Sequence, residues 1–186
     1  MPRAHKSQKG QLLLDHGRLA GSWFHRTVVF VCQHDREGAF GLVLNRRFEK
    51  PVGQALVAEL PANLAEQPLF LGGPVQSGTL SFLHTGLLPT DADIIPRVNV
   101  GHSLEELIEL AGEPESLRQY RVFAGYAGWG PGQLDDELKR DSWVTHPASV
   151  ELMFGTPPES IWANILRLKG WRYRLAAEAP DDLSSN

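Results

Sequence analysis

Residues 125–134 read Gly-Tyr-Ala-Gly-Trp-Gly-Pro-Gly-Gln-Leu, and they separate two segments with different hydrophobic patterns. The segment before them, Gln119–Ala124, is mostly apolar, which predicts a strand. The segment after them carries Leu134 and Leu138 at helical spacing. Acidic residues in its first turn and Lys139 in a later one suit the helix dipole. The stretch therefore predicts a connection from a strand to a helix.

The glycines of this connection leave two interpretations open. Glycine adopts backbone angles that other residues disfavour, and N–H groups ahead of a helix bind anions. One interpretation is a ligand-binding loop with Tyr126 and Trp129 as walls, Gln133 as a polar contact, and the backbone exposed at Gly128 and Gly130. The other is a tight corner whose two aromatic side chains belong to the core. No lysine stands in the P-loop position and the glycine spacing is not Gly-x-Gly-x-x-Gly, so a nucleotide-phosphate motif matches weakly.

Short strands and helices fill the rest of the chain without strict βαβ alternation, which favours an α+β domain. Thr27–Cys32 is a continuous β-branched and aromatic run, and such a run predicts a strand buried on both faces. Capping patterns at Ser103–Glu106 and Thr156–Glu159 predict two helices. A short helix is predicted at Pro51–Leu60. The other predicted strands are Gln11–Asp15, Phe40–Leu44, Pro68–Leu71, Leu80–His84 and Arg97–Val100.

The bulk composition is that of one globular domain. Of the 186 residues, 42% are hydrophobic and 22% are charged, as in ordinary folded domains. We expect that domain at residues 11–175, with mobile tails at 1–10 and 176–186. The formal charge of −4 argues against a dedicated nucleic-acid binder. No window approaches a membrane span, the N-terminus is no secretory signal and Cys32 is the single cysteine, so we expect a cytoplasmic protein.

Polar and glycine residues at the ends of predicted strands are candidates for ligand contacts. If Thr27–Cys32 and Phe40–Leu44 form a hairpin, Arg26 lies near Asn45 and Arg46. Arginines there could grip a phosphate or a carboxylate, or they could be surface pairs that contribute little. Gly72 and Gly73 end another predicted strand, as a close-approach loop or as a simple turn.

The histidines offer an alternative chemistry. His34 could act as a general base with Asp35 nearby, and His84 closes another predicted strand. The competing interpretation is a solvated hairpin loop for the first and a structural side chain for the second. The seven histidines show none of the spacings of a metal site, so we expect no metal and no cofactor.

Several segments, taken in order, resemble one protein family. They are Arg26–Asp35, Gly38–Arg46, Leu71–Gln76 and Gly125–Leu134 with Glu137 and Leu138, and Trp143 and Phe154 also fall into place. Over about residues 10–170 the chain is similar to the YqgE/AlgH family, also called UPF0301 or DUF179, and the Gly-Tyr-Ala-Gly-Trp run is the most specific part of that likeness.

The resemblance implies a bacterial cytosolic α+β protein whose bifurcated, largely antiparallel sheet curls into a pseudo-barrel with flanking helices. It brings no agreed catalytic residues. One label of the family is transcriptional regulator of alginate synthesis, but no DNA-binding motif accompanies that label here. The chain departs from the family pattern at Arg47, where proline usually follows Asn-Arg, and it lacks the usual Gly-His-Ala near the C-terminus.

Three functional hypotheses follow. The first is a ligand- or partner-binding regulatory or housekeeping protein, whose partner is a protein or a small molecule. The second is a hydrolase-like enzyme that uses His34 or His84 as base. The third is a transcription- or RNA-linked regulator that binds through the basic cluster of residues 167–174. The ligand groove of the first hypothesis comprises Arg26, Asn45, Arg46, Gly72, Gly73, Tyr126, Gly128, Trp129, Gly130 and Gln133.

Overall fold

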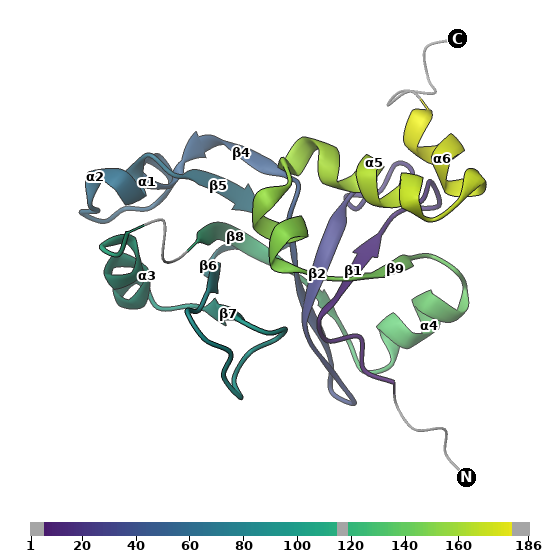
Figure 1. The fold of residues 1–186 in the computed structure, drawn as a ribbon, viewed down its shortest axis with the longest axis horizontal. Coiled ribbons are helices and arrows are strands. Elements are labelled where there is room, and N and C mark those ends of the chain that lie inside the picture. The colour runs from purple at the N-terminus through teal and green to yellow at the C-terminus, as the bar shows by residue number, and fades with distance from the viewer. Residues whose placement is uncertain (1–5, 115–118, 180–186) are drawn as a thin grey trace.

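The computed structural model describes residues 6–114 and 119–179 (Figure 1). Its strands are β1 (Gln11–Leu14), β2 (Val28–Asp35), β3 (Gly38–Val43), β4 (Arg47–Pro51), β5 (Pro68–Leu71), β6 (Val75–Thr85), β7 (Val98–Gly101), β8 (Tyr120–Trp129) and β9 (Val144–Pro147). Its helices are α1 (Val52–Ala55), α2 (Ala62–Ala65), α3 (Leu104–Ala111), α4 (Gln133–Lys139), the π-helix η1 (Glu151–Gly155), α5 (Pro158–Leu168) and α6 (Trp171–Glu178).

Strand β8 joins two halves of one sheet. The strand order is β4-β5-β8-β3-β2-β1-β9, while β6 also pairs with β8 and β7 pairs with β6. In the first half of β8, Phe123 lies opposite Phe70 of β5 and Ser81 of β6. In the second half, Trp129 lies opposite Ala39 of β3. The sheet therefore branches at β8.

The expected α+β class is confirmed, with a mainly antiparallel sheet and helices around it. Among the described strands, only β5 and β8 pair in parallel. Figure 1 shows α1, α2 and α3 beside the β4–β7 half, α4 beside the other half, and α5 and α6 along one side of the sheet. The sheet ends at β4 and β9 and does not close. The expected pseudo-barrel is therefore not confirmed.

Gly125 lies where β8 changes partners. Its φ is +69°, and an added Cβ would lie 2.7 Å from the Gly73 carbonyl oxygen and 3.0 Å from that of Val75. Glycine tolerates both conditions because it lacks the Cβ. The strand thus continues through Gly125 to Trp129, whereas we expected it to end at Ala124. The turn of the glycine-rich stretch is confined to residues 130–132.

Strand β2 is buried on both faces, as its unbroken apolar run predicts. Val28 and Phe30 pack in one cluster with the inner face of α5. Val29 and Val31 point the other way, into a cluster that holds Trp129. A third cluster lies under α1, α2 and α3. Layers on both sides of β2 explain why hydrophobic residues do not alternate with polar ones along it.

The two helices predicted from capping patterns are present, but only Ser103 caps its helix, because the N-cap of α5 is Pro157 and no side chain caps it. The Ser103 hydroxyl oxygen accepts from the Glu106 N–H at 3.3 Å, while its own proton goes to Glu105. Helix α5 begins at Pro158 and ends before Gly170, whose φ of +113° redirects the chain into α6. Helix α6 is not expected from the sequence, where Gly170 indicates only the end of a helix.

The described parts of the two expected tails lie against the domain. The Gly10 N–H donates to Val31 O at 2.9 Å, and the Gln8 N–H donates to His34 Nδ1 at 3.0 Å. At the other end, α6 continues to Glu178. Residues 1–5 and 180–186 of those tails are outside the described part of the chain. Within that part, no helix combines the length and the apolar character needed to cross a membrane.

Candidate functional site

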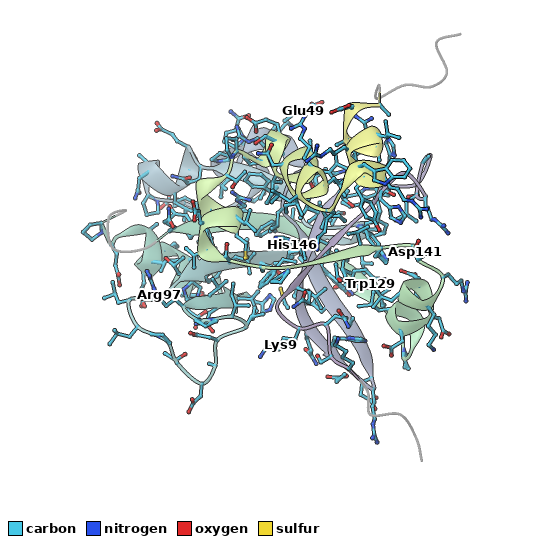
Figure 2. All side chains as sticks on the ribbon, turned by 45° about the vertical axis from the view of Figure 1, so that its right-hand side comes forward. Lys9, Glu49, Arg97, Trp129, Asp141 and His146 are labelled. Atoms are coloured by element: carbon cyan, nitrogen blue, oxygen red, sulfur yellow. The ribbon has the colours of Figure 1, made fainter. Side chains whose placement is uncertain are left out.

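The two aromatic residues of the glycine-rich stretch do not face one surface. Tyr126 packs against the cluster beneath α5, whereas Trp129 belongs to the cluster on the opposite face of the sheet. Side chains three positions apart on a strand point to opposite faces. Trp129 is 7% exposed, and Figure 2 places it between the sheet and α4. These two residues therefore do not form facing walls of a single groove.

Polar contacts of this stretch converge on Glu137 of α4. The indole N–H groups of Trp129 and Trp143 both donate to Glu137 Oε2 at 2.8 Å. Gln133 Nε2 donates to the other carboxylate oxygen at 2.9 Å, and Gln133 Oε1 accepts from the Gly130 N–H at 3.1 Å. The side-chain amide of Gln133, which we expected to contact a ligand, thus closes the corner between β8 and α4.

The paired glycines after β5 are positions of close backbone approach. An added Cβ on Gly72 would lie 2.3 Å from the Gly125 carbonyl oxygen, and one on Gly73 would lie 2.0 Å from the Tyr126 carbonyl carbon. Gly128, by contrast, is exposed, and a Cβ there would meet the Tyr126 ring at 3.2 Å. Gly72 and Gly73 thus hold the chain against β8.

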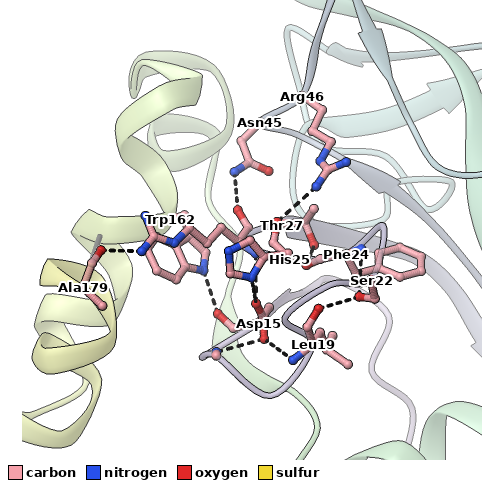
Figure 3. Close-up of polar contacts among 12 residues, drawn as sticks. Asp15, Leu19, Ser22, Phe24, His25, Thr27, Asn45, Arg46, Trp162 and Ala179 are labelled. Atoms are coloured by element: carbon pink, nitrogen blue, oxygen red, sulfur yellow. Dashed lines mark hydrogen bonds and ion pairs between the residues drawn. The ribbon is translucent and has the colours of Figure 1, made fainter. Parts of the chain in front are cut away.

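Arg26, Asn45 and Arg46 come together, as the hairpin predicts, around the loop that precedes β2. Figure 3 shows Asn45 and Arg46 beside this loop. The Asn45 side chain accepts from the Val28 N–H at 2.9 Å and donates to Arg26 O at 2.8 Å. Arg46 donates to His25 O at 3.1 Å and stacks over the ring of Trp23. Asn45 and Arg46 therefore bind the loop, and Arg46's pKa is lowered by burial.

Asp15 organises the other side of this loop. Its carboxylate is fully buried and accepts backbone N–H bonds from Gly17, Leu19 and Arg26. Arg26 adopts a φ of +53°, unusual for a residue with a side chain. Its guanidinium lies over the Trp162 ring, 4.9 Å from the centroid, and donates to Ala179 O. This cluster ties the loop to α5 and the end of α6.

The two candidate histidines lie at opposite ends of β8. His84 is in register with Tyr120, the first residue of β8. His34 is in register with Ala39, which lies opposite Trp129 at the last residue of β8. His34 is 6% exposed, with Nε2 3.9 Å from Asp135. The structure does not bring these histidines into one site, and no cluster in the described residues fits a metal ion.

The basic cluster of residues 167–174 spans the end of α5 and the start of α6. The Arg172 guanidinium lies over the Trp171 ring, 5.6 Å from the centroid, and Arg174 donates to Arg167 O at 3.2 Å. Trp171 is 69% exposed. Trp171, Arg172 and Arg174 are therefore on the surface. Arg174 is hydrogen-bonded within the chain, and Arg172 stacks on Trp171.

A cleft that the sequence analysis did not predict lies between β4, β5, the start of β8 and the segment that leads into α5. Its volume is about 390 Å³. It is lined by Arg47, Gln67, Pro68, Phe70, Tyr120, Arg121, Val122, Phe154, Gly155, Thr156, Pro157 and Pro158. We call it the Arg47–Arg121 cleft. It contains none of the ten residues assigned to the expected groove.

Arg121 is fixed at the floor of this cleft. It is half-buried, its Nη1 donates to Leu44 O at 3.0 Å, and its guanidinium carbon lies 4.7 Å from the ring centroid of Phe70 and 5.9 Å from that of Phe154. Contact with two phenyl rings and one carbonyl holds the planar group in place.

The cleft is strongly cationic. Arg47 is exposed, and its guanidinium carbon lies 5.9 Å from the same Phe70 centroid. Burial, followed by the charge of Arg47, lowers the pKa of Arg121 to about 10, so Arg121 stays protonated at neutral pH. Among the described lining residues none is acidic, and no described carboxylate pairs with either arginine. The N-terminus of α5, which is the positive end of its helix dipole, also lies at the wall of this cleft.

One sequence signal could have pointed to this cleft. Arg121 is a charged residue inside a predicted strand, between apolar neighbours, and a buried charge needs a partner or a function. Arg47 stands out in the sequence only as the residue that replaces the family's usual proline after Asn-Arg. Their meeting could not be foreseen, because it depends on β5 lying between β4 and β8.

Comparisons with known proteins agree on one family. A family model described as AlgH-like, DUF179, matches residues 12–174. A UPF0301 protein of Chlorobium luteolum is 36% identical over 178 residues, which cover 92% of this chain and 91% of that protein. A UPF0301 protein of Cytophaga hutchinsonii is 37% identical over 178 residues, which cover 94% of this chain and 96% of that protein.

Two solved structures share the architecture. The solution structure of the AlgH protein from Pseudomonas aeruginosa, UPF0301, has a TM-score of 0.71 and 30% identity, with 95% of this chain and 98% of that chain covered. A crystal structure of a Corynebacterium diphtheriae protein has a TM-score of 0.73 at 22% identity, with 94% of each chain covered, and shows likeness of fold. Since the family model spans most of the chain and relatives exceed 30% identity, the chain belongs to the AlgH-like family, DUF179.

Proposed function

We propose that this protein is a cytoplasmic ligand-binding protein that takes a small anionic molecule in the Arg47–Arg121 cleft, and that ligand binding serves a regulatory or housekeeping role. The observation that carries the proposal is the position of two guanidinium groups over one ring with no carboxylate from the described residues beside them. A partly buried, uncompensated cation costs free energy, and an anion from outside would offset that cost.

The residues of the cleft favour binding over catalysis. Its described lining offers guanidinium, amide and hydroxyl groups and two phenyl rings, but no aspartate, glutamate or histidine that could serve as general base. Arginine forks match carboxylate and phosphate oxygens in two-point contacts. Because Arg121 is held before the ligand arrives, little side-chain ordering is needed at the moment of binding.

The test is anion binding by isothermal titration calorimetry with Arg121→Gln. Inorganic phosphate and a set of carboxylates serve as probes at constant ionic strength, because salt screens charge interactions. Loss of a charge-assisted contact typically costs about 1.5–3 kcal/mol, so we expect Kd to rise roughly 10- to 150-fold. Arg36→Gln, an exposed arginine at the β2–β3 turn, is the matched control and should bind as the unmodified protein does.

A second variant separates binding from folding, since Arg121 also donates to Leu44 O. Arg121→Lys keeps the positive charge and loses the planar fork, so we expect weaker binding with the circular dichroism of the native fold. The proposal would be contradicted if the folded Arg121→Lys and Arg121→Gln proteins bound each probe as tightly as the unmodified protein does. It would also be contradicted if the unmodified protein bound none of the probes.

A further inference from the structure

The two arginines of the cleft come from different strands but share one face of the sheet. Arg47 of β4 lies opposite Phe70 of β5, and residues paired across antiparallel strands point to the same side. Phe70 is in parallel register with Phe123 of β8, so Arg121, two positions earlier, projects to that side too. Two cations therefore flank one phenyl ring across three neighbouring strands.

The charges of the cleft exceed what one negative charge can balance. Both guanidinium groups face the Phe70 ring, and after burial, which is the larger cause, the charge of Arg47 lowers the pKa of Arg121 further, as expected for two cations that repel each other. A ligand with a single negative charge would pair with one guanidinium and leave this repulsion only partly relieved. A doubly charged ligand can pair with both.

The two arginines differ in how firmly they are held. Arg121 is bound to Leu44 O and contacts two phenyl rings, so its free N–H edge has a set direction. Arg47 is exposed at the rim, where its contact in the described structure is with Phe70. Arg121 is thus suited to bind any oxyanion, while Arg47 adds a second charge that can adjust to the ligand.

Resting on the anion-binding function proposed above, we propose that the Arg47–Arg121 cleft selects a small-molecule dianion, and that Arg47 is the residue that sets the preference over monoanions. The two negative charges sit either on one phosphate group or on two carboxylates of a short chain. Both kinds of ligand present the same chemistry to the cleft, namely two charges within reach of two guanidinium groups.

Titration of the full chain and of Arg47→Gln at pH 7.5 and fixed ionic strength tests this assignment. The probes are inorganic phosphate, which carries both charges on one group, succinate, which carries one charge on each of two carboxylates, and acetate, which carries a single charge. We expect the unmodified protein to prefer phosphate or succinate over acetate. Arg47→Gln should weaken binding of that dianion about tenfold, as expected for one lost charge-assisted contact, and leave acetate within about twofold.

The outcomes separate this inference from the proposed function. If acetate binds the unmodified protein as tightly as both dianions, or if Arg47→Gln weakens all three probes equally, the selectivity is wrong while the cleft remains an anion site. If none of the probes binds the unmodified protein, both proposals fall. Tighter binding of phosphate than of succinate, or of succinate than of phosphate, identifies which class of dianion fits the cleft. Lys50→Gln, a neighbouring exposed cation on β4, should leave the three affinities unchanged.

Discussion

Glu137 shows how one residue decides the nature of the glycine-rich corner. Its carboxylate accepts from two tryptophan indoles and from Gln133, at distances of 2.8–2.9 Å. Both indole rings are buried, so an indole N–H that loses this acceptor is costly to leave without a hydrogen bond. In the sequence, Glu137 is one of the acidic residues near a helix start and one of the residues that carry the family resemblance.

Replacing Glu137 by alanine should lower the free energy of unfolding by about 2–4 kcal/mol, because two buried indole N–H groups lose their acceptor. Glu137→Gln keeps one accepting oxygen and should cost less. Urea denaturation measures both, with Glu109→Ala on the exposed side of α3 as the control. Equal stability of Glu137→Ala and Glu109→Ala would show that the corner does not depend on this carboxylate.

At the scale of elements, the contact between the end of β5 and β8 depends on residues without side chains. The Gly72 N–H donates to Ala124 O at 2.9 Å, and Gly72 O accepts from the Val43 N–H at 2.9 Å. The segment therefore connects β3 to β8 at the point where the sheet branches. A Cβ at Gly73 would overlap the Tyr126 backbone, which cannot move aside as a flexible side chain can.

Gly73→Ala should therefore destabilise the protein by about 1–3 kcal/mol, since overpacking forces backbone shifts. Gly78→Ala is the matched control: no atom lies within 4 Å of the added Cβ, and its effect should be small. Thermal unfolding of the two variants compares them directly. A Gly73→Ala protein as stable as Gly78→Ala would mean that β5 and β8 do not approach as closely as described.

At the scale of the whole molecule, β8 is the element that both halves of the sheet share. Its first half pairs with β5 and β6, and its second half pairs with β3. Neither half keeps its central pairing if β8 is lost. The chain should therefore unfold as one unit, even though its core divides into three clusters.

Urea unfolding should accordingly give a single transition, with coincident curves from tryptophan fluorescence and far-ultraviolet circular dichroism. Fluorescence reports mainly on the half with Trp23, Trp129 and Trp143, whereas circular dichroism reports on all elements. Two separate transitions would show that the halves fold independently and that β8 does not couple them.

The sequence by itself determined the local features. The unbroken apolar run of β2 predicts a strand buried on both faces, and Ser103 predicts the start of α3, because both depend on neighbouring residues in the chain. The resemblance in the Gly-Tyr-Ala-Gly-Trp run led to the correct family. Proximity of Arg26, Asn45 and Arg46 followed from the hairpin.

Only the tertiary structure decided where side chains meet. The φ of +69° at Gly125 lets β8 continue past the predicted end of the strand, so Tyr126 and Trp129 lie on one strand and, three positions apart, point to opposite faces. The parallel pairing of β5 with β8 brings Arg121 to the ring that Arg47 also contacts. Such meetings depend on which strands become neighbours, and no local pattern around either arginine specifies that order.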